Sequence, residues 1–181
     1  MTEFVQIVPG RLWQVDNLLT AEQTDHILAV DWMNLPWITS PQQRAWSRRE
    51  IAWDSAAIQL PKAWHDQQVA TINRAVGTSF VRASGHFWVD LPGFACAMHT
   101  DGHLSNALQM YWIMPDHTYG TGFYHYKQPD SLLHQFDSQP NTGYLMLNHP
   151  NPDGSQPLQW HGMFRTVPEG YIRVTSYWHF E

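Results

Sequence analysis

Apolar residues gather on one side of a helical pattern near the start of the chain. Thr20 and Gln23 have the spacing of a capping box, in which each side chain bonds to the backbone of the other residue. The apolar positions that follow on one side are Ile27, Leu28, Ala29 and Trp32. The pattern predicts a helix over about 21–32. It ends before Pro36, because the residue preceding a proline resists helical geometry.

A second helical pattern begins after Pro61. Its apolar positions lie three or four residues apart, and Gly77 is a residue type that commonly terminates a helix. The segment between the two helices, 38–60, has no regular pattern and carries three basic residues, Arg44, Arg48 and Arg49. We interpret these arginines as a solvated face or loop; the alternative is that they attract an acidic substrate.

Beyond Gly77 the pattern changes to short aromatic and β-branched runs separated by turn residues. These runs predict strands at Ser79–Val81, His86–Asp90, Ala95–Met98, Ala107–Met114, Gly122–Lys127, Gly143–Asn148, Gly162–Val167 and Tyr171–Phe180. So many short strands are typical of a sandwich or jelly roll. We therefore expect an α+β fold. Residues 78–181 would form a double-stranded β-helix (jelly roll), and the N-terminal helices of a support region, 1–77, would pack on one sheet.

Composition fits a single domain over residues 1–181. Hydrophobic residues make up 43% of the chain and charged residues 14%, which excludes a disordered protein. The net charge of −6 argues against nucleic-acid and anionic-membrane partners. The single cysteine, Cys96, excludes a disulfide framework, and no apolar run has the length of a membrane span. We expect a cytoplasmic protein.

The first candidate for chemistry is a His-x-Asp pair. His99 and Asp101 are two residues apart, and on an extended chain such residues point to the same face. With eleven histidines in the chain, such a pair is common by chance. A comparable pair, His179 and Glu181, ends the sequence with nothing downstream to complete a site.

A third ligand would complete the two-histidine, one-carboxylate set that holds non-haem iron. We favour His161, which leads directly into a strand pattern, over His149, which precedes a proline in a turn-rich stretch. His103 is interpreted as a loop residue near the mouth of the site. Further along, alternation on the last strand places Arg173, Thr175 and Tyr177 on one face. A guanidinium with a hydroxyl two residues on suits capture of a small dicarboxylate.

The order of these motifs resembles the Fe(II)/2-oxoglutarate-dependent oxygenases, in particular the prolyl-4-hydroxylase-like branch. The resemblance covers most of the chain and rests on 15–23, His99-Thr100-Asp101, 109–113, 120–124, 142–147, His161-Gly162 and Arg173-Val174-Thr175. It implies that Fe(II) is held by His99, Asp101 and His161. It also implies that 2-oxoglutarate is bound by Arg173, Thr175 and Tyr111. The implied reaction consumes O2 and 2-oxoglutarate, releases succinate and CO2, and hydroxylates a C–H bond.

Two features depart from the usual pattern of that family. The double glycine after the central strand is replaced by Gly120-Thr121-Gly122. Tyr111 faces the site together with Gln109 only in one register, because a one-residue slip would present the neighbouring side chains instead. The segment 148–157 is longer than the fold requires and is either a lid or a surface excursion.

The expected substrate is an amino acid, a peptidyl group (prolyl included) or another small molecule. Two other functions stay open at this point. One is a cupin-like metal protein that does not use 2-oxoglutarate. The other is a non-catalytic jelly-roll domain that binds a partner through its aromatic surface.

Overall fold

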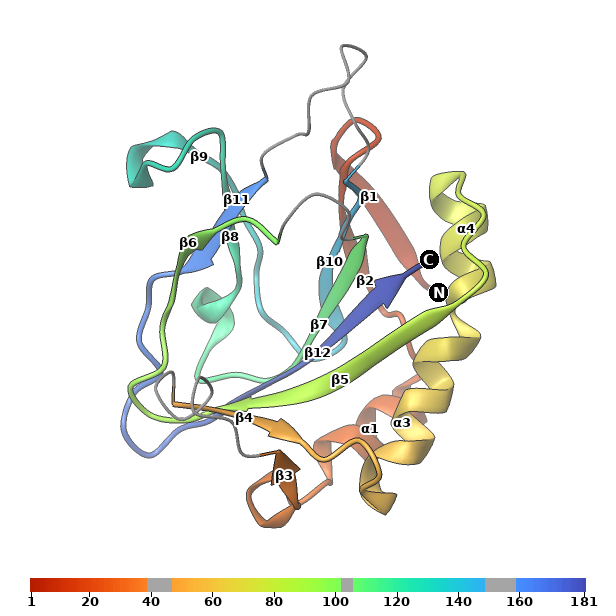
Figure 1. Ribbon diagram of the computed structural model, residues 1–181, viewed down its shortest axis with the longest axis vertical. Helices are drawn as coiled ribbons and strands as arrows, with labels where there is room; N and C mark the ends of the chain where they lie inside the picture. Colours follow the sequence, from red (N-terminus) through yellow and green to blue (C-terminus); the bar gives the residue numbers. More distant parts are fainter. Residues whose placement is uncertain (39–46, 102–105, 149–158) are drawn as a thin grey trace.

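The computed structural model describes residues 1–38, 47–101, 106–148 and 159–181. It consists mostly of antiparallel sheet with few helices (Figure 1). Arg44, His103, His149 and most of the segment 148–157 lie outside the described residues.

The larger sheet has eight strands and contains segments from both ends of the chain. Its strands, in spatial order, are β1 (Glu3–Val8), β2 (Leu12–Asp16), β10 (Thr142–Met146), β7 (Ala107–Ile113), β12 (Arg173–Phe180), β5 (Ala83–Asp90), β4 (Arg48–Ile51) and β3 (Trp37–Ile38). All neighbouring strands pair antiparallel.

The smaller sheet has four strands and faces the larger one (Figure 1). Its order is β6 (Cys96–His99), β11 (Trp160–Met163), β8 (Gly122–Tyr124) and β9 (Leu132–Gln135). After β5 the chain alternates between the two sheets at almost every strand, so the same short segments build both walls of the space between them.

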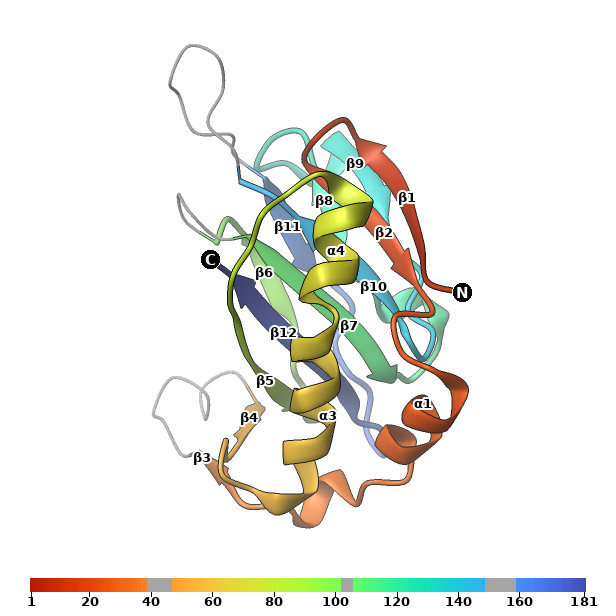
Figure 2. The ribbon, with the colours of Figure 1, turned by 90° about the vertical axis from the view of Figure 1, so that its right-hand side faces the viewer.

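The helices are α1 (Ala21–Leu28), α3 (Ala56–Gln67) and α4 (Val69–Val76), with 3-10 turns at Trp32–Asn34, His117–Tyr119 and Pro129–Ser131. Figure 2 shows α3 and α4 running across the outer face of the larger sheet. Among the described residues, no helix is long and apolar enough to cross a membrane.

Both predicted helices exist, with different bounds. The capping box at Thr20 and Gln23 is present, but α1 stops at Leu28, and Trp32 begins a separate 3-10 turn. The second helix begins at Ala56, ahead of Pro61, and α3 gives way to α4 at Gln68. Gly77 ends α4 in the left-handed conformation, as expected.

Helices, but no strands, were predicted for the N-terminal region, 1–77. Four strands, β1 to β4, come from it, and they extend the larger sheet at both edges. Strand β9 was also missed. The predicted strand at Ser79–Val81 is wrong, because those residues precede β5 and are not in a sheet. The seven other predicted strands are present with shifted ends.

The two faces of the larger sheet have different cores. Its outer face packs against the helices, where Ile27, Ile58 and Ile72 meet Trp112 and Trp178. Its inner face meets the smaller sheet through aromatic side chains, namely Tyr111, Phe123, Phe136, Tyr144 and Tyr177. The inner face is the one that carries the candidate site.

Candidate metal centre

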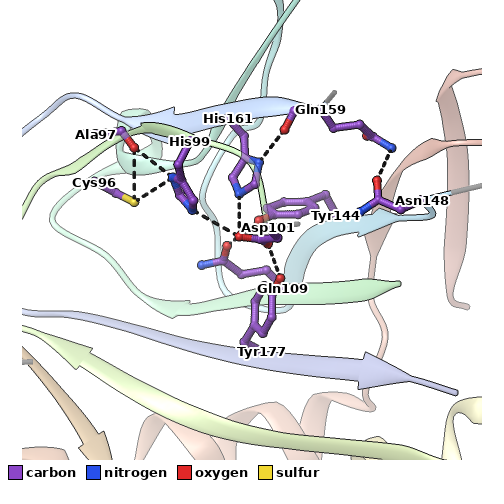
Figure 3. A network of polar contacts seen from close by, with 10 residues as sticks. All are labelled: Cys96, Ala97, His99, Asp101, Gln109, Tyr144, Asn148, Gln159, His161 and Tyr177. Atoms are coloured by element: carbon purple, nitrogen blue, oxygen red, sulfur yellow. Dashed lines mark hydrogen bonds and ion pairs between the residues drawn. The ribbon is translucent and has the colours of Figure 1, made fainter. Parts of the chain in front are cut away.

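Two paired strands of the smaller sheet bring three candidate ligands together. His99 ends β6 and lies directly opposite His161 on β11 in the antiparallel register. Asp101 follows two residues after His99, so its side chain turns toward the same space. Figure 3 shows both imidazoles pointing at the Asp101 carboxylate. All three side chains, predicted from sequence as one set, therefore meet at one point.

The distances within this set suit a bound cation. His99 Nε2 lies 3.2 Å and His161 Nε2 3.5 Å from Asp101 Oδ1. One ligand atom from each residue lies within 4.8 Å of the other two. Two imidazole nitrogens and one carboxylate oxygen on one side leave the opposite side open, which is the arrangement of non-haem iron centres.

Each histidine is oriented by a backbone carbonyl of its own strand. His99 Nδ1 lies 2.9 Å from Ala97 O, and His161 Nδ1 lies 2.9 Å from Gln159 O. A carbonyl only accepts hydrogen bonds, so each Nδ1 carries the proton. The Nε2 lone pairs are thereby left to bind a metal, and the rings are fixed in the required tautomer.

The pKa values reflect a cluster without a cation. The hydrogen bond to Asp101, followed by the contact with Cys96, raises the pKa of His99 to about 10. Burial opposes ionisation of Asp101, but the hydrogen bonds from His161 and His99 outweigh it and hold the pKa of that carboxyl well below its usual range. A divalent cation would displace the proton between His99 Nε2 and the Asp101 carboxylate and bind in its place.

Tyr177 completes the surroundings of Asp101. Its hydroxyl donates to Asp101 Oδ2, the oxygen that faces away from the histidines (Figure 3). Burial, together with the negative charge of Asp101, raises the pKa of Tyr177 above its ordinary value, so the hydroxyl keeps its proton and remains a donor. Tyr177 lies on β12, so the larger sheet fixes the carboxylate that the smaller sheet presents.

Burial differs across the centre. The His161 side chain is 5% exposed and stacks on Phe123, with ring centres 5.2 Å apart. The His99 side chain is 43% exposed and Asp101 is 19% exposed. Solvent and small molecules therefore reach the centre from the His99 side.

A cavity of about 260 Å³ connects this centre with Arg173. That volume lies just below the usual range for ligand pockets, about 300–1,000 Å³, and suits a compact molecule. Its walls include Gln109, Tyr144, Trp88, His86 and His179 besides the metal-ligand candidates.

Arg173 begins β12, four residues before Tyr177, lines the same cavity and is 2% exposed. Its Nη1 donates to Asp90 Oδ2 at 2.6 Å, while its Nε is buried without a hydrogen-bond partner among the described residues. The Thr175 hydroxyl is in the same condition. Such unpaired buried groups are rare in folded proteins and mark a place where a polar ligand fits.

Tyr111 lies on the face that the sequence analysis favoured. Its hydroxyl oxygen accepts from the Thr121 backbone N–H at 2.9 Å, and the Arg173 guanidinium lies 5.7 Å from its ring centre. Burial raises the pKa of Tyr111, so its O–H remains a donor. Gln109 shares this face and accepts from the Tyr144 hydroxyl at 2.7 Å. The alternative register is wrong, since Met110 and Trp112 pack against the helices.

Arg48 and Asp90 belong to this site, although neither was predicted to do so from the sequence. Arg48 lines the cavity and binds Asp90, so its interpretation as part of a solvated face or loop is wrong. Asp90 is fully buried between Arg48 and Arg173. The available signal was a lone aspartate ending an apolar run, which requires a cationic partner. His179 lines the cavity, while Glu181 pairs with Arg82 at the surface, so those two do not form a second metal pair.

The chain resembles known proteins in structure but not in sequence. Neither a scan against protein-family models nor a search of curated proteins found a match. Solved structures do match. A prolyl-4-hydroxylase from Pseudomonas putida is 15% identical with a TM-score of 0.60, covering 94% of this chain and 92% of that one. An oxidoreductase of the 2OG-Fe(II) oxygenase family from Burkholderia pseudomallei is 13% identical with a TM-score of 0.63, covering 96% and 85%.

A third match is HygX from Streptomyces hygroscopicus, solved with nickel, 2-oxoglutarate and hygromycin B. It is 10% identical with a TM-score of 0.61, and the match covers 93% of this chain and 82% of that one. Identities this low establish the fold alone. The chain has the fold of the prolyl-4-hydroxylase-like and other 2OG-Fe(II) oxygenase structures.

Proposed function

We propose that this protein is an Fe(II)- and 2-oxoglutarate-dependent dioxygenase that hydroxylates a C–H bond and releases succinate and CO2. One observation carries the proposal. A single cavity is lined both by a His-Asp-His cluster and by a buried arginine with an unpaired donor. A dicarboxylate that binds a metal through one end and an arginine through the other matches such a cavity.

The residues fit an iron ion. His99, Asp101 and His161 would hold it through two Nε2 atoms and one carboxylate oxygen. When bound, Fe(II) supplies the coupling of 2-oxoglutarate decarboxylation and O2 reduction to C–H hydroxylation. Tyr177 keeps one oxygen of Asp101 engaged, so the carboxylate stays in one orientation.

The residues fit 2-oxoglutarate as well. Arg173 Nε and Thr175 Oγ1 are buried and unpaired, and Tyr111 retains a hydroxyl proton close by. Arg173, which lines the cavity, would bind the carboxylate that lies away from the metal; Thr175 and Tyr111, which are not among the described lining residues, would support it from the same face of the sheet. Arg173 and Thr175 are themselves buried from bulk water, which strengthens every charged contact at this place.

Strand order supports a jelly-roll core. Four strands of the larger sheet (β10, β7, β12 and β5) face the four of the smaller sheet, and consecutive strands alternate between the two except at β8 and β9. We infer that these eight strands are the double-stranded β-helix and that the region before β5 adds helices and edge strands to it.

The substrate enters from the exposed His99 side in this proposal. His86 and His179 line the cavity and contact the Tyr177 ring. The matched structures include prolyl hydroxylases and HygX with hygromycin B bound. A peptidyl group, an amino acid or another small molecule therefore remains the proposed substrate class.

A second candidate function has its own support. Arg173 already forms an ion pair with Asp90, so its charge has a partner without any bound ligand. This contact favours a cupin-like metal protein that binds no 2-oxoglutarate.

An anaerobic titration separates the two functions. Fe(II) and then 2-oxoglutarate are added to the apoprotein, and a weak visible charge-transfer band is expected to develop. His99→Ala should remove the band by removing iron, and Arg173→Ala should weaken it by lowering 2-oxoglutarate affinity. His125→Ala, an exposed histidine, should change nothing. Iron binding with no effect of 2-oxoglutarate would establish the cupin-like function instead.

A further inference from the structure

A fully buried carboxylate, Asp90, joins two arginines that line the cavity. Arg48 donates from Nε and Nη2 to the two oxygens of Asp90, at 2.5 and 3.0 Å. Arg173 donates from Nη1 to Oδ2 of the same carboxylate at 2.6 Å. The Asp90 side chain has no exposed surface. Three neighbouring strands, β4, β5 and β12, thus bring one residue each into a charged cluster.

The charges of this cluster do not cancel. Two guanidinium groups and one carboxylate leave one positive charge in excess. Buried charge without a partner is costly, so the cluster is complete only when another negative group joins it. Without Arg48, Asp90 would neutralise Arg173 and leave little attraction for a second carboxylate.

Arg48 is held firmly at this position. Its guanidinium carbon lies 4.0 Å from the centre of the Trp88 ring and 4.2 Å from that of Phe94. The side chain is 10% exposed and lines the same cavity as Arg173 and the metal-ligand candidates. Stacking between two aromatic rings fixes the plane of the guanidinium, which suits recognition of a planar carboxylate.

We propose that Arg48 and Arg173 together bind the distal carboxylate of 2-oxoglutarate, with Asp90 as the positioning residue that orients both. The inference rests on the proposed function and goes beyond the single arginine that the family resemblance implies. Arg48, from the N-terminal region, thereby becomes a determinant of selectivity for 2-oxo dicarboxylates over 2-oxo monocarboxylates.

Two 2-oxo acids distinguish the loss of distal-carboxylate binding from a general disruption of the site. 2-Oxoglutarate and 2-oxopentanoate have the same carbon chain and the same metal-chelating end, but only 2-oxoglutarate has a distal carboxylate. Binding of each acid to the Mn(II)-loaded protein is measured by calorimetry, for the wild type and for Arg48→Met. Methionine keeps an apolar side chain between Trp88 and Phe94 while removing the charge.

The matched control is Arg49→Gln. Arg49 is the next residue on β4, and its guanidinium lies over Trp37, 4.7 Å from the ring centre. It is not among the described residues that line the cavity. The control therefore removes an arginine from the same strand without touching the Asp90 cluster.

Arg48→Met is expected to lower 2-oxoglutarate affinity about 10- to 100-fold, the scale of a lost charged hydrogen bond. 2-Oxopentanoate affinity should stay within about twofold for both variants. Arg48→Lys keeps the charge and should retain part of the preference for 2-oxoglutarate over 2-oxopentanoate. This variant is used in place of Arg48→Met if the methionine variant does not fold. Equal losses for both acids, or no loss for either, would overturn the role of Arg48. A wild-type protein that binds Mn(II) but neither acid would overturn the proposed function with it.

Discussion

The two faces of β12 bury polar groups in opposite ways. On the outer face, Ser176 accepts from Trp112 Nε1 at 3.0 Å and lies 3.1 Å from His65 Nε2. On the inner face, the Thr175 hydroxyl has no hydrogen-bond partner among the described residues. Both residues are fully buried.

This difference separates structural polarity from functional polarity. The outer network is complete, since His65 Nδ1 also lies 2.7 Å from Pro61 O, and it joins α3 to the sheet. The inner face keeps donors and an excess positive charge that only a ligand would satisfy. Stability is sacrificed on the inner face for binding, as is usual for functional sites. The following predictions test that distinction.

The largest expected effect is on the inner face. Asp90→Ala would leave two buried guanidinium groups without their carboxylate and should lower the free energy of unfolding by about 3–5 kcal/mol. Urea denaturation measures the loss. Asp130→Ala, at an exposed position, should stay within about 0.5 kcal/mol of wild type. An Asp90→Ala protein as stable as wild type would mean that the arginines do not depend on this carboxylate.

Acid should destabilise the outer face through His65. Burial lowers the pKa of His65 from 6.5 to about 4. Between these values the unfolded chain binds a proton that the folded chain does not, so stability is full above pH 6.5 and falls as the pH drops toward 4. The loss is about 3 kcal/mol. Urea denaturation of wild type and His65→Phe across pH 4–7 measures it. The difference in free energy of unfolding between wild type and His65→Phe should shrink by about 3 kcal/mol from pH 7 to pH 4. A difference that does not change with pH would contradict the low pKa of His65.

Metal should stabilise the protein through the smaller sheet. Mn(II) at one hundred times its dissociation constant should raise the free energy of unfolding by about 2.7 kcal/mol. EDTA should reverse the gain, and Asp101→Asn should abolish it by removing an anionic ligand. Thermal unfolding with and without metal measures the effect, with His125→Ala as the control. A gain that survives in Asp101→Asn would place the cation elsewhere.

The smallest effect compares adjacent residues on opposite faces. Ser176→Ala should destabilise the protein by about 1–3 kcal/mol, because it strands Trp112 Nε1 and His65 Nε2. Thr175→Val replaces an unpaired hydroxyl by a methyl group of similar shape, so stability should change by less than about 0.5 kcal/mol. The same Thr175→Val change should weaken 2-oxoglutarate binding about tenfold. Equal destabilisation by Ser176→Ala and Thr175→Val would show that the two faces of β12 do not differ in how they use buried polar groups.

The sequence was most informative where the geometry is local. His99 and Asp101 share a face through simple alternation, and Arg173, Thr175 and Tyr177 do the same on β12. Such short-range features leave a recognisable pattern in the chain.

Long-range pairing left no such pattern. Asp90 meets Arg48 and Arg173 from residues 42 and 83 positions away, through strand pairing that no local periodicity specifies. The strands β1 to β4 were missed for the same reason, since their short polar-apolar runs become strands only against a neighbouring edge. The arginine cluster therefore became visible only in the folded protein.

The position of Arg48 has a kinetic consequence. It lies on β4, a four-residue strand whose outer neighbour, the sheet edge β3, has only two residues. Short edge segments open far more often than central strands such as β12. A ligand held by both arginines should therefore dissociate at a rate set by opening of this edge. Slower amide hydrogen exchange in β4 with ligand bound than without it would show that the ligand suppresses this opening.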